Sequence, residues 1–178
     1  MRAIKNLFIL LMACSTSACM TYHNFPEVPS TPSITPKHSG VLVYQIEGSA
    51  LFAGPTAIRN VVTSEAPYAS SVPTDKEVKS GDYLHVSIAQ TSPSMAATVF
   101  GYISYSTLTI LPFWSNQDGS VLTFMLYRNG ALVSSKEYVI NRGTFVWLGM
   151  LPFAWVNFMT PSEEQAFAAS TSDFLHTL

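Results

Sequence analysis

The stretch Val121–Ile140, VLTFMLYRNGALVSSKEYVI, carries the clearest structural signal in the chain. At its centre, Asn129-Gly130 is a preferred dipeptide for a two-residue type I′ turn, because both turn positions need a positive φ. Runs rich in Val, Leu, Tyr and Phe, which favour strands, flank this dipeptide on both sides. The stretch therefore predicts an antiparallel β-hairpin, and the other elements are placed around it.

Further strands are predicted before and after the hairpin. Residues 40–48, GVLVYQIEG, are β-branched and bounded by glycines, and residues 83–90, YLHVSIAQ, alternate apolar and polar side chains. Residues 98–111, TVFGYISYSTLTIL, and 144–151, TFVWLGML, have a strand-like composition. Residues 57–62, AIRNVV, fit a short helix or a strand equally well. Residues 66–82, which contain the densest group of charged side chains in the chain, are predicted as a solvated loop.

A helix is predicted at the C-terminus. Thr160-Pro161-Ser162-Glu163 has the pattern of a helix start, with Thr as N-cap, Pro at the first helical position and Glu closing a capping box. Phe167, Phe174 and Leu178 then give an apolar stripe for packing on a sheet. Residues 40–178 are thus predicted as one α+β domain: an antiparallel β-meander sheet with an N-terminal strand and at least one packed helix, the C-terminal one.

The composition restricts the possible partners. Only 11% of the 178 residues are charged and 48% are hydrophobic, which indicates a large core, an extensive partner surface or contact with lipid. The nine Lys and Arg residues are scattered and the net charge is −2, so no basic patch indicates nucleic-acid binding.

The N-terminus carries the strongest functional signal. MRAIKN is a short basic region, LFILLMA is an apolar region too short to span a bilayer, and CSTSAC is a region of small residues. This segment resembles bacterial lipoprotein precursors, which are cleaved before a cysteine that receives acyl chains such as palmitate. The resemblance implies a signal peptide over residues 1–18 and lipidation of Cys19, with Cys14 as the alternative.

The resemblance also implies a location. In Gram-negative lipoproteins, a residue other than Asp after the lipidated cysteine directs the protein to the outer membrane, and here Met20 follows Cys19. We therefore expect lipid anchoring at the periplasmic face of the outer membrane. Residues 19–39 contain Pro26, Pro29, Pro32 and Pro36 and are predicted as an extended tether between the anchor and the domain.

No catalytic constellation is found. The four histidines share no ligand-like spacing with another His, Asp or Glu, and no nucleophile elbow, Walker loop or dinucleotide fingerprint occurs. His85, two positions from Tyr83 on a predicted strand, is interpreted as a surface residue rather than a catalyst. We expect no enzyme activity, no metal and no cofactor.

Two long stretches lack charged residues and histidine, residues 86–117 and 143–162, and they contain all three tryptophans. Each includes a Leu-Pro-Phe motif, in LTILPFWSNQ (108–117) and LGMLPFAWVN (148–157). They can be core strands that end at proline, aromatic patches at a membrane or partner surface, or, for the second stretch, a spanning helix. Core packing is the default interpretation. A meander places the two motifs at opposite edges of the sheet, so they are not expected to form one site.

The second stretch is the better candidate for an exposed interaction patch, made by Trp147, Phe153, Trp155 and Phe158, with Trp114 as a further candidate, while the first motif is assigned to the core. The expected function is binding or an accessory role in cell-envelope assembly, maintenance or transport, through an envelope protein or lipid partner. The alternatives are insertion of segment 143–160 into the bilayer interface and an envelope hydrolase.

Overall fold

The structure, a computed structural model, describes residues 19–27, 38–50, 53–107, 109–149, 155 and 159–178. The predicted signal peptide 1–18 with Cys14, and the patch residues Phe153 and Phe158, lie outside these ranges. Within them the chain forms six strands and three longer helices. In chain order these are β1 (Cys19–His23), β2 (His38–Gly48), α2 (Gly54–Glu65), β3 (Tyr68–Pro73), β4 (Asp82–Thr91), α3 (Met95–Ser106), β5 (Phe113–Arg128), β6 (Ala131–Val146) and α4 (Glu163–His176).

The strands form one mixed sheet in the order β1-β6-β5-β4-β2-β3. β1 with β6 and β4 with β5 are antiparallel, but β2 is parallel to both β3 and β4. The α+β class is confirmed, whereas the purely antiparallel meander is wrong. The reason is α2, which lies between β2 and β3 in the chain and returns it to the same end of the sheet, as parallel neighbours require.

The hairpin predicted from Asn129-Gly130 is confirmed. Both residues have positive φ, 50° and 79°, and they join β5 and β6, which are 16 residues long each. The strands predicted around 40–48 and 83–90 are also confirmed, as β2 and β4.

Three other segments differ from their predictions. Residues 98–111 were predicted as a strand, but most of them belong to helix α3, whose N-cap Ser94 accepts a hydrogen bond from the backbone N–H of Ala97. The predicted loop 66–82 contains strand β3. Helix α4 begins at Glu163 rather than beside Thr160, whose hydroxyl donates instead to the carbonyl oxygen of Met20.

The chain divides into two compact units. Unit 1 comprises residues 1–23, 92–118 and 141–162, and unit 2 comprises residues 24–91, 119–140 and 163–178. Strands β5 and β6 contribute one part to each unit. The Pro-rich segment 24–37 therefore connects β1 of unit 1 to β2 of unit 2 in the chain. The first five residues of the range predicted as tether are paired with β6 instead.

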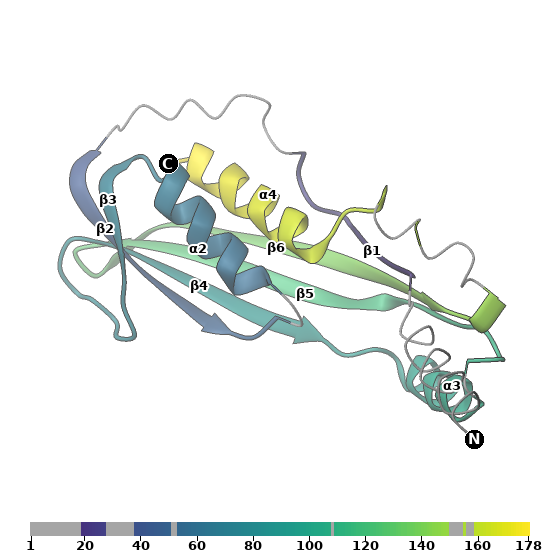
Figure 1. Ribbon diagram of the computed structural model, residues 1–178. Coiled ribbons are helices and arrows are strands. Elements are labelled where there is room, and N and C mark those ends of the chain that lie inside the picture. The colour runs from purple at the N-terminus through teal and green to yellow at the C-terminus, as the bar shows by residue number, and fades with distance from the viewer. Residues whose placement is uncertain (1–18, 28–37, 51–52, 108, 150–154, 156–158) are drawn as a thin grey trace, which may run out of the picture. The chain divides into compact units, whose positions relative to one another are not determined.

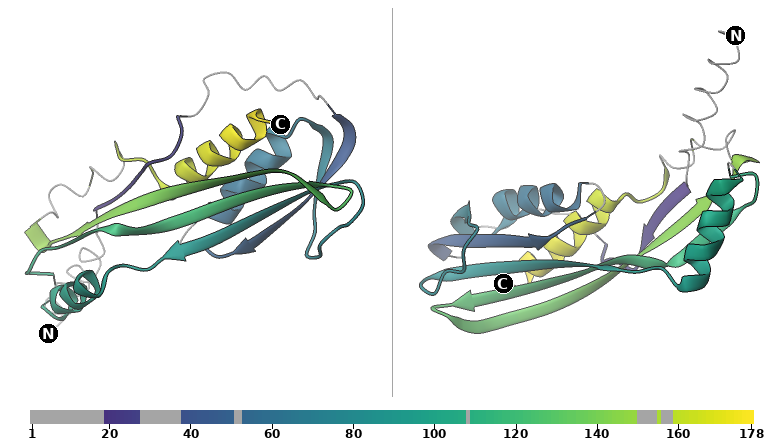
Figure 2. Two further views of the ribbon diagram at one scale, coloured as in Figure 1. Left: turned by 180° about the vertical axis from the view of Figure 1, so that it is seen from behind. Right: turned by 90° about the horizontal axis from the view of Figure 1, so that it is seen from below.

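Unit 2 has a conventional hydrophobic core. Helices α2 and α4 lie side by side over one face of its strands (Figures 1 and 2). The rings of Phe124 from β5 and Phe174 from α4 stack with centroids 5.0 Å apart, and both side chains are fully buried. A Cβ atom on Gly54, at the start of α2, would come within 2.5 Å of the buried Phe167 ring of α4, so glycine permits the close approach of the two helices.

Polar contacts fix α4 to the hairpin in unit 2. The carboxylate of Asp173 accepts hydrogen bonds from Lys136 Nζ at 2.7 Å and from the Tyr138 hydroxyl at 2.6 Å. These two donors hold the pKa of Asp173 below its usual value. Burial, together with the hydrogen bond to Asp173, raises the pKa of Tyr138.

Candidate functional site

The two units differ in where their apolar side chains lie. Of the 23 buried hydrophobic residues within the described ranges, 21 belong to unit 2. Of the 17 large hydrophobic residues that are exposed there, 12 belong to unit 1. Exposed apolar groups of this density mark surfaces that contact a partner or lipid, so the candidate site lies in unit 1.

Helix α3 supplies six of the 12 exposed large hydrophobic residues of unit 1, and its small side chains face inward. Gly101 and Ser104 are its buried residues, and the ring of Phe113 lies 3.6 Å from where a Cβ on Gly101 would stand. The large apolar side chains of α3 are exposed instead: Met95, Val99, Phe100, Tyr102, Ile103 and Tyr105, with exposed fractions from 43% to 86%. An ordinary surface helix has the opposite arrangement, with its large apolar residues toward the core.

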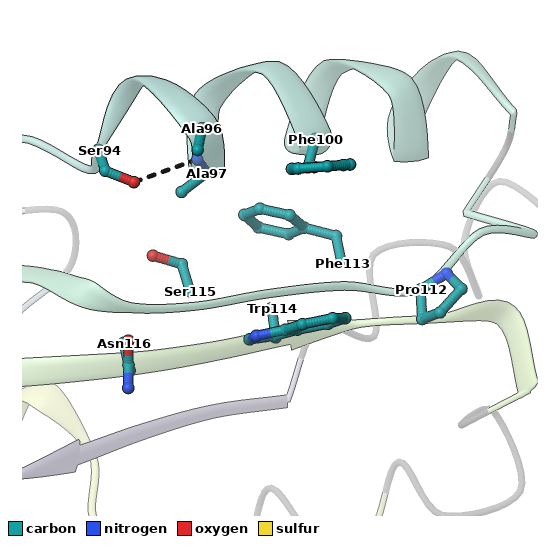
Figure 3. A pocket seen from close by; sticks show the side chains of 9 residues that line it. All are labelled: Ser94, Ala96, Ala97, Phe100, Pro112, Phe113, Trp114, Ser115 and Asn116. Carbon is teal, nitrogen blue, oxygen red and sulfur yellow. Dashed lines mark hydrogen bonds between the residues drawn. The ribbon is translucent and has the colours of Figure 1, made fainter.

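A pocket of about 410 Å³ lies between α3 and the start of β5 (Figure 3). Phe113 and Ser115 point from the strand toward the helix, whereas Trp114 and Asn116 point to the other side of the strand (Figure 3). None of the described residues that line the pocket is charged. Its lining residues are Ser94, Ala96, Ala97, Phe100, Pro112, Phe113, Trp114, Ser115 and Asn116.

The two Leu-Pro-Phe stretches meet in unit 1. The indole N–H of Trp147 donates to the carbonyl oxygen of Ile110 at 3.1 Å, and the backbone N–H of Leu148 donates to the carbonyl oxygen of Thr109 at 2.8 Å. The expectation that the two stretches lie apart is therefore wrong. It counted residues 144–151 as a separate strand after the hairpin, but residues 144–146 belong to β6, which returns the chain to the end of the sheet where β5 begins.

The assignment of the first stretch to the core is also wrong. Ile110 and Leu111 are 61% and 49% exposed, and strand β5 begins after Pro112 rather than ending before it. Trp114 is 69% exposed, more than Trp155 at 56% and Trp147 at 42%. The structure thus places three of the five predicted patch residues on the surface of unit 1, together with α3, which the sequence analysis missed.

Unit 1 carries very little charge from Cys19 onward. Its only Asp, Glu, Lys or Arg residues in that part of the sequence are Asp118 and Arg142. These two form an ion pair in which Arg142 Nε donates to Asp118 Oδ2 at 3.0 Å, with 15% and 9% of their side chains exposed. Ser115 donates a further hydrogen bond to Asp118 at 3.2 Å. The charges of these two residues are paired with each other inside the unit, so neither leaves an unpaired charge on its surface.

The predicted lipidation residue also belongs to unit 1. Cys19 is the first residue of β1 and pairs with Phe145 of β6. Because β5 and β6 have equal length, the start of β5 at Phe113 lies at the same end of the hairpin as Val146. Cys19 and the strand residue that packs on α3 are therefore near the same end of the sheet.

Unit 2 contains a polar pocket of about 360 Å³. His85 Nε2 lies 3.0 Å from a carboxylate oxygen of Glu47, and Tyr83 donates to the side chain of Gln45. Glu77 and Tyr127 complete the lining. Histidine beside a carboxylate can act as a base, but none of these lining residues is the Ser, Thr, Cys or Lys that nucleophilic catalysis needs.

Two kinds of feature are absent from the residues that the structure describes. None of the helices there combines the length and apolar character needed to cross a bilayer. No three His, Cys, Asp or Glu side chains gather there closely enough to hold a metal ion.

Comparisons with known proteins add little. No family model matches the chain. No curated protein matches it either. Among solved structures, protein XCC0632 from Xanthomonas campestris, described as DUF330, is similar with 11% identity and a TM-score of 0.40, over 86% of this chain and 91% of that chain. A PelC dodecamer from Paraburkholderia phytofirmans has 11% identity and a TM-score of 0.29, over 87% and 95%. At these TM-scores, neither protein's properties are carried over to this chain.

Proposed function

We propose that this chain is a lipoprotein anchored through Cys19 to the periplasmic face of the outer membrane, where it acts by binding rather than by catalysis. One observation carries the proposal: the cysteine that the signal pattern selects is the first residue of β1, in the unit with the apolar surface. In this arrangement an acyl anchor on Cys19 joins unit 1 without an intervening tether.

The binding role is in envelope assembly, maintenance or transport, with a lipid or an envelope protein as the partner. The apolar surface of unit 1 supports this proposal, because a surface without charge is suited to a partner that also lacks charge. An envelope hydrolase is the less favoured alternative, since the polar pocket of unit 2 offers a His–carboxylate pair but no nucleophile among its lining residues.

A second candidate function is contact of segment 143–160 with the bilayer interface. The exposure of Trp147 and Trp155 favours it, because tryptophan prefers positions that are partly apolar and partly wet. If this segment makes the contact, Trp147→Ser weakens the binding of the chain to lipid vesicles. Unchanged binding would remove the segment from the contact.

The anchor is tested by labelling cells with radioactive palmitate and separating their inner and outer membranes. Wild-type protein is expected to carry label and to fractionate with the outer membrane. Cys19→Ala is expected to lose the label, and the matched variant Cys14→Ala to keep it. Label that persists in Cys19→Ala but not in Cys14→Ala moves the anchor to Cys14, and no label in either variant or in wild type refutes the proposal.

A further inference from the structure

The outer face of α3 presents large side chains from successive helical turns. Met95, Val99, Tyr102 and Ile103 are spaced by four, three and one residues, so they share one side of the helix, opposite Gly101 and Ser104. Their exposed fractions are 86%, 51%, 74% and 43%. The helix contains no charged residue at all. In water this face would be unfavourable, which indicates that something apolar covers it.

The anchor determines what lies nearest to this face. Cys19 pairs with Phe145 at the end of the hairpin where β5 begins, and β5 holds α3 through the contact of Phe113 with Gly101. β1 and β5 are each neighbours of β6, and sheet neighbours are about 4.8 Å apart, so the anchor strand is about 10 Å from the strand under α3. A lipid-modified Cys19 therefore keeps α3 at high effective concentration beside the bilayer.

Contact with lipid would bury no unpaired charge of unit 1. Asp118 and Arg142 already satisfy each other within the unit, and the exposed side chains of α3 end in methyl groups, a thioether, rings and hydroxyls. Tyrosine at such a surface can keep its hydroxyl in the headgroup region while its ring contacts the acyl chains.

From these observations we infer that the outer face of α3 docks on the interface of the bilayer in which Cys19 is anchored. The partner of the apolar surface is thus the lipid itself, and the helix lies against the membrane without crossing it. This inference rests on the proposed function, since the anchor is what brings α3 to the bilayer. It also moves the membrane contact from segment 143–160 to α3.

The test uses the mature chain from residue 19, with Cys19→Ser, which lacks the lipid but contains every residue that the structure describes. Binding is measured by sedimentation with vesicles of zwitterionic phosphatidylcholine. The chain is expected to bind, and to bind equally when salt is raised from about 0.05 M to about 0.5 M, because no charge contributes to the contact. The tryptophans, all of which belong to unit 1, provide a second readout through their emission.

A matched pair of substitutions locates the contact. Val99→Asp on α3 is expected to lower vesicle partitioning about tenfold, through loss of a buried apolar side chain and desolvation of a charge. Val133→Asp, at a residue of unit 2 with 54% exposure against 51% for Val99, is expected to leave partitioning unchanged. Tyr102→Asp, at a 74% exposed site, repeats the test if Val99→Asp does not fold.

Three results would overturn the docking. The first is that the chain does not bind vesicles, and the second is that Val99→Asp and Val133→Asp lower vesicle partitioning equally. The third is that the chain self-associates in the ultracentrifuge, that Val99→Asp abolishes this self-association, and that neither protein binds vesicles. The last result would assign the face to a second copy of the chain. Palmitate labelling at Cys19 is scored separately, so a labelled protein whose unlipidated chain ignores vesicles keeps the anchor and loses only the docking.

Discussion

Helices α2 in unit 2 and α3 in unit 1 are both 12 residues long, and they arrange their apolar residues in opposite ways. α2 buries Ala57, Ile58, Val61 and Val62, and its exposed residues include Arg59 and Asn60. α3 buries Gly101 and Ser104 and exposes its large apolar residues. The first helix has the arrangement of an ordinary surface helix, and the second has the reverse arrangement, which is the basis of the proposed docking.

The same contrast distinguishes the units as wholes. Unit 2 is held by a large hydrophobic core with rings in direct contact, whereas unit 1 has Tyr22 and Val146 as its buried hydrophobic residues in the described ranges. Unit 1 depends more on polar contacts, such as the Asp118–Arg142 pair and the bonds from Trp147 and Leu148. Buried apolar packing and exposed apolar surface are thus concentrated in different parts of the molecule, and the following predictions test that division.

The largest difference is expected between two identical substitutions. Phe124→Ala in unit 2 removes a fully buried ring that contacts Phe174 and Tyr138, and should destabilise the protein by about 3–5 kcal/mol. Phe100→Ala in unit 1 removes a ring that is 64% exposed, and should change stability by less than about 1 kcal/mol. Urea unfolding followed by circular dichroism measures both, and equal effects would contradict the division.

Two arginines provide the next comparison. Arg142→Ala leaves the carboxylate of Asp118 buried without its cation in unit 1, and should cost about 3 kcal/mol. Arg128→Ala in unit 2 breaks the pair with Asp82, in which the arginine side chain is 46% exposed, and should cost clearly less. Tryptophan fluorescence during urea unfolding reports on unit 1 and should detect the Arg142 effect. A larger loss from Arg128→Ala would refute the prediction.

The two helical glycines should respond differently to alanine. Gly54→Ala forces a Cβ to 2.5 Å from the Phe167 ring, which has no room to move in the core, and should destabilise by about 1–3 kcal/mol. Gly101→Ala places its Cβ at an ordinary 3.6 Å from Phe113 and should be neutral or stabilising by up to about 1 kcal/mol. The change in stability of both variants is measured by thermal unfolding. A destabilised Gly101→Ala protein would show that α3 packs more tightly than its exposure indicates.

The smallest effect concerns acid stability in unit 2. The pKa of Asp173 is lowered in the fold by Lys136 and Tyr138, so its contribution is fully present above the ordinary value of 3.8 and is lost as pH falls through the lower, folded value. Asp173→Asn should therefore destabilise by about 1–2 kcal/mol at neutral pH and flatten the loss of stability at acid pH. Glu164→Gln, at an exposed position of the same helix, is the control. It should change neither the stability at neutral pH nor the loss of stability at acid pH.

Some of the fold could be read from local sequence. The hairpin followed from Asn129-Gly130, because positive φ at two adjacent positions is a demand that few residue pairs meet. Strand β4 followed from its alternation, and Leu84 and Val86 are indeed fully buried. Residues 57–62 were predicted as either a helix or a strand, although the buried residues of α2 repeat at helical spacing and Pro55 near its start is a usable helix signal.

Helix α3 could not be read in the same way. Its Val, Phe, Tyr, Ile and Thr residues favour strands, so the composition predicted the wrong element. The residues that position it are Gly101, which faces the ring of Phe113, and Ser104, whose hydroxyl donates to the carbonyl oxygen of Leu111, so both depend on a later segment. The two Leu-Pro-Phe stretches meet because they flank the open ends of the β5–β6 hairpin, whereas the strand count had placed a further strand at 144–151.

By itself, the sequence determined the hairpin, a helix near the C-terminus and the absence of charge from two long stretches, and it predicted a signal peptide with Cys19 or Cys14 as the lipidated residue. These features are local, because a turn, a cap or an uncharged run depends on neighbouring residues alone. Only the tertiary structure decided that the sheet is mixed, that β1 begins at Cys19 in the apolar unit and that α3 turns its large side chains outward. Each of these depends on which distant segments pack together, and burial is a property of that packing rather than of residue type.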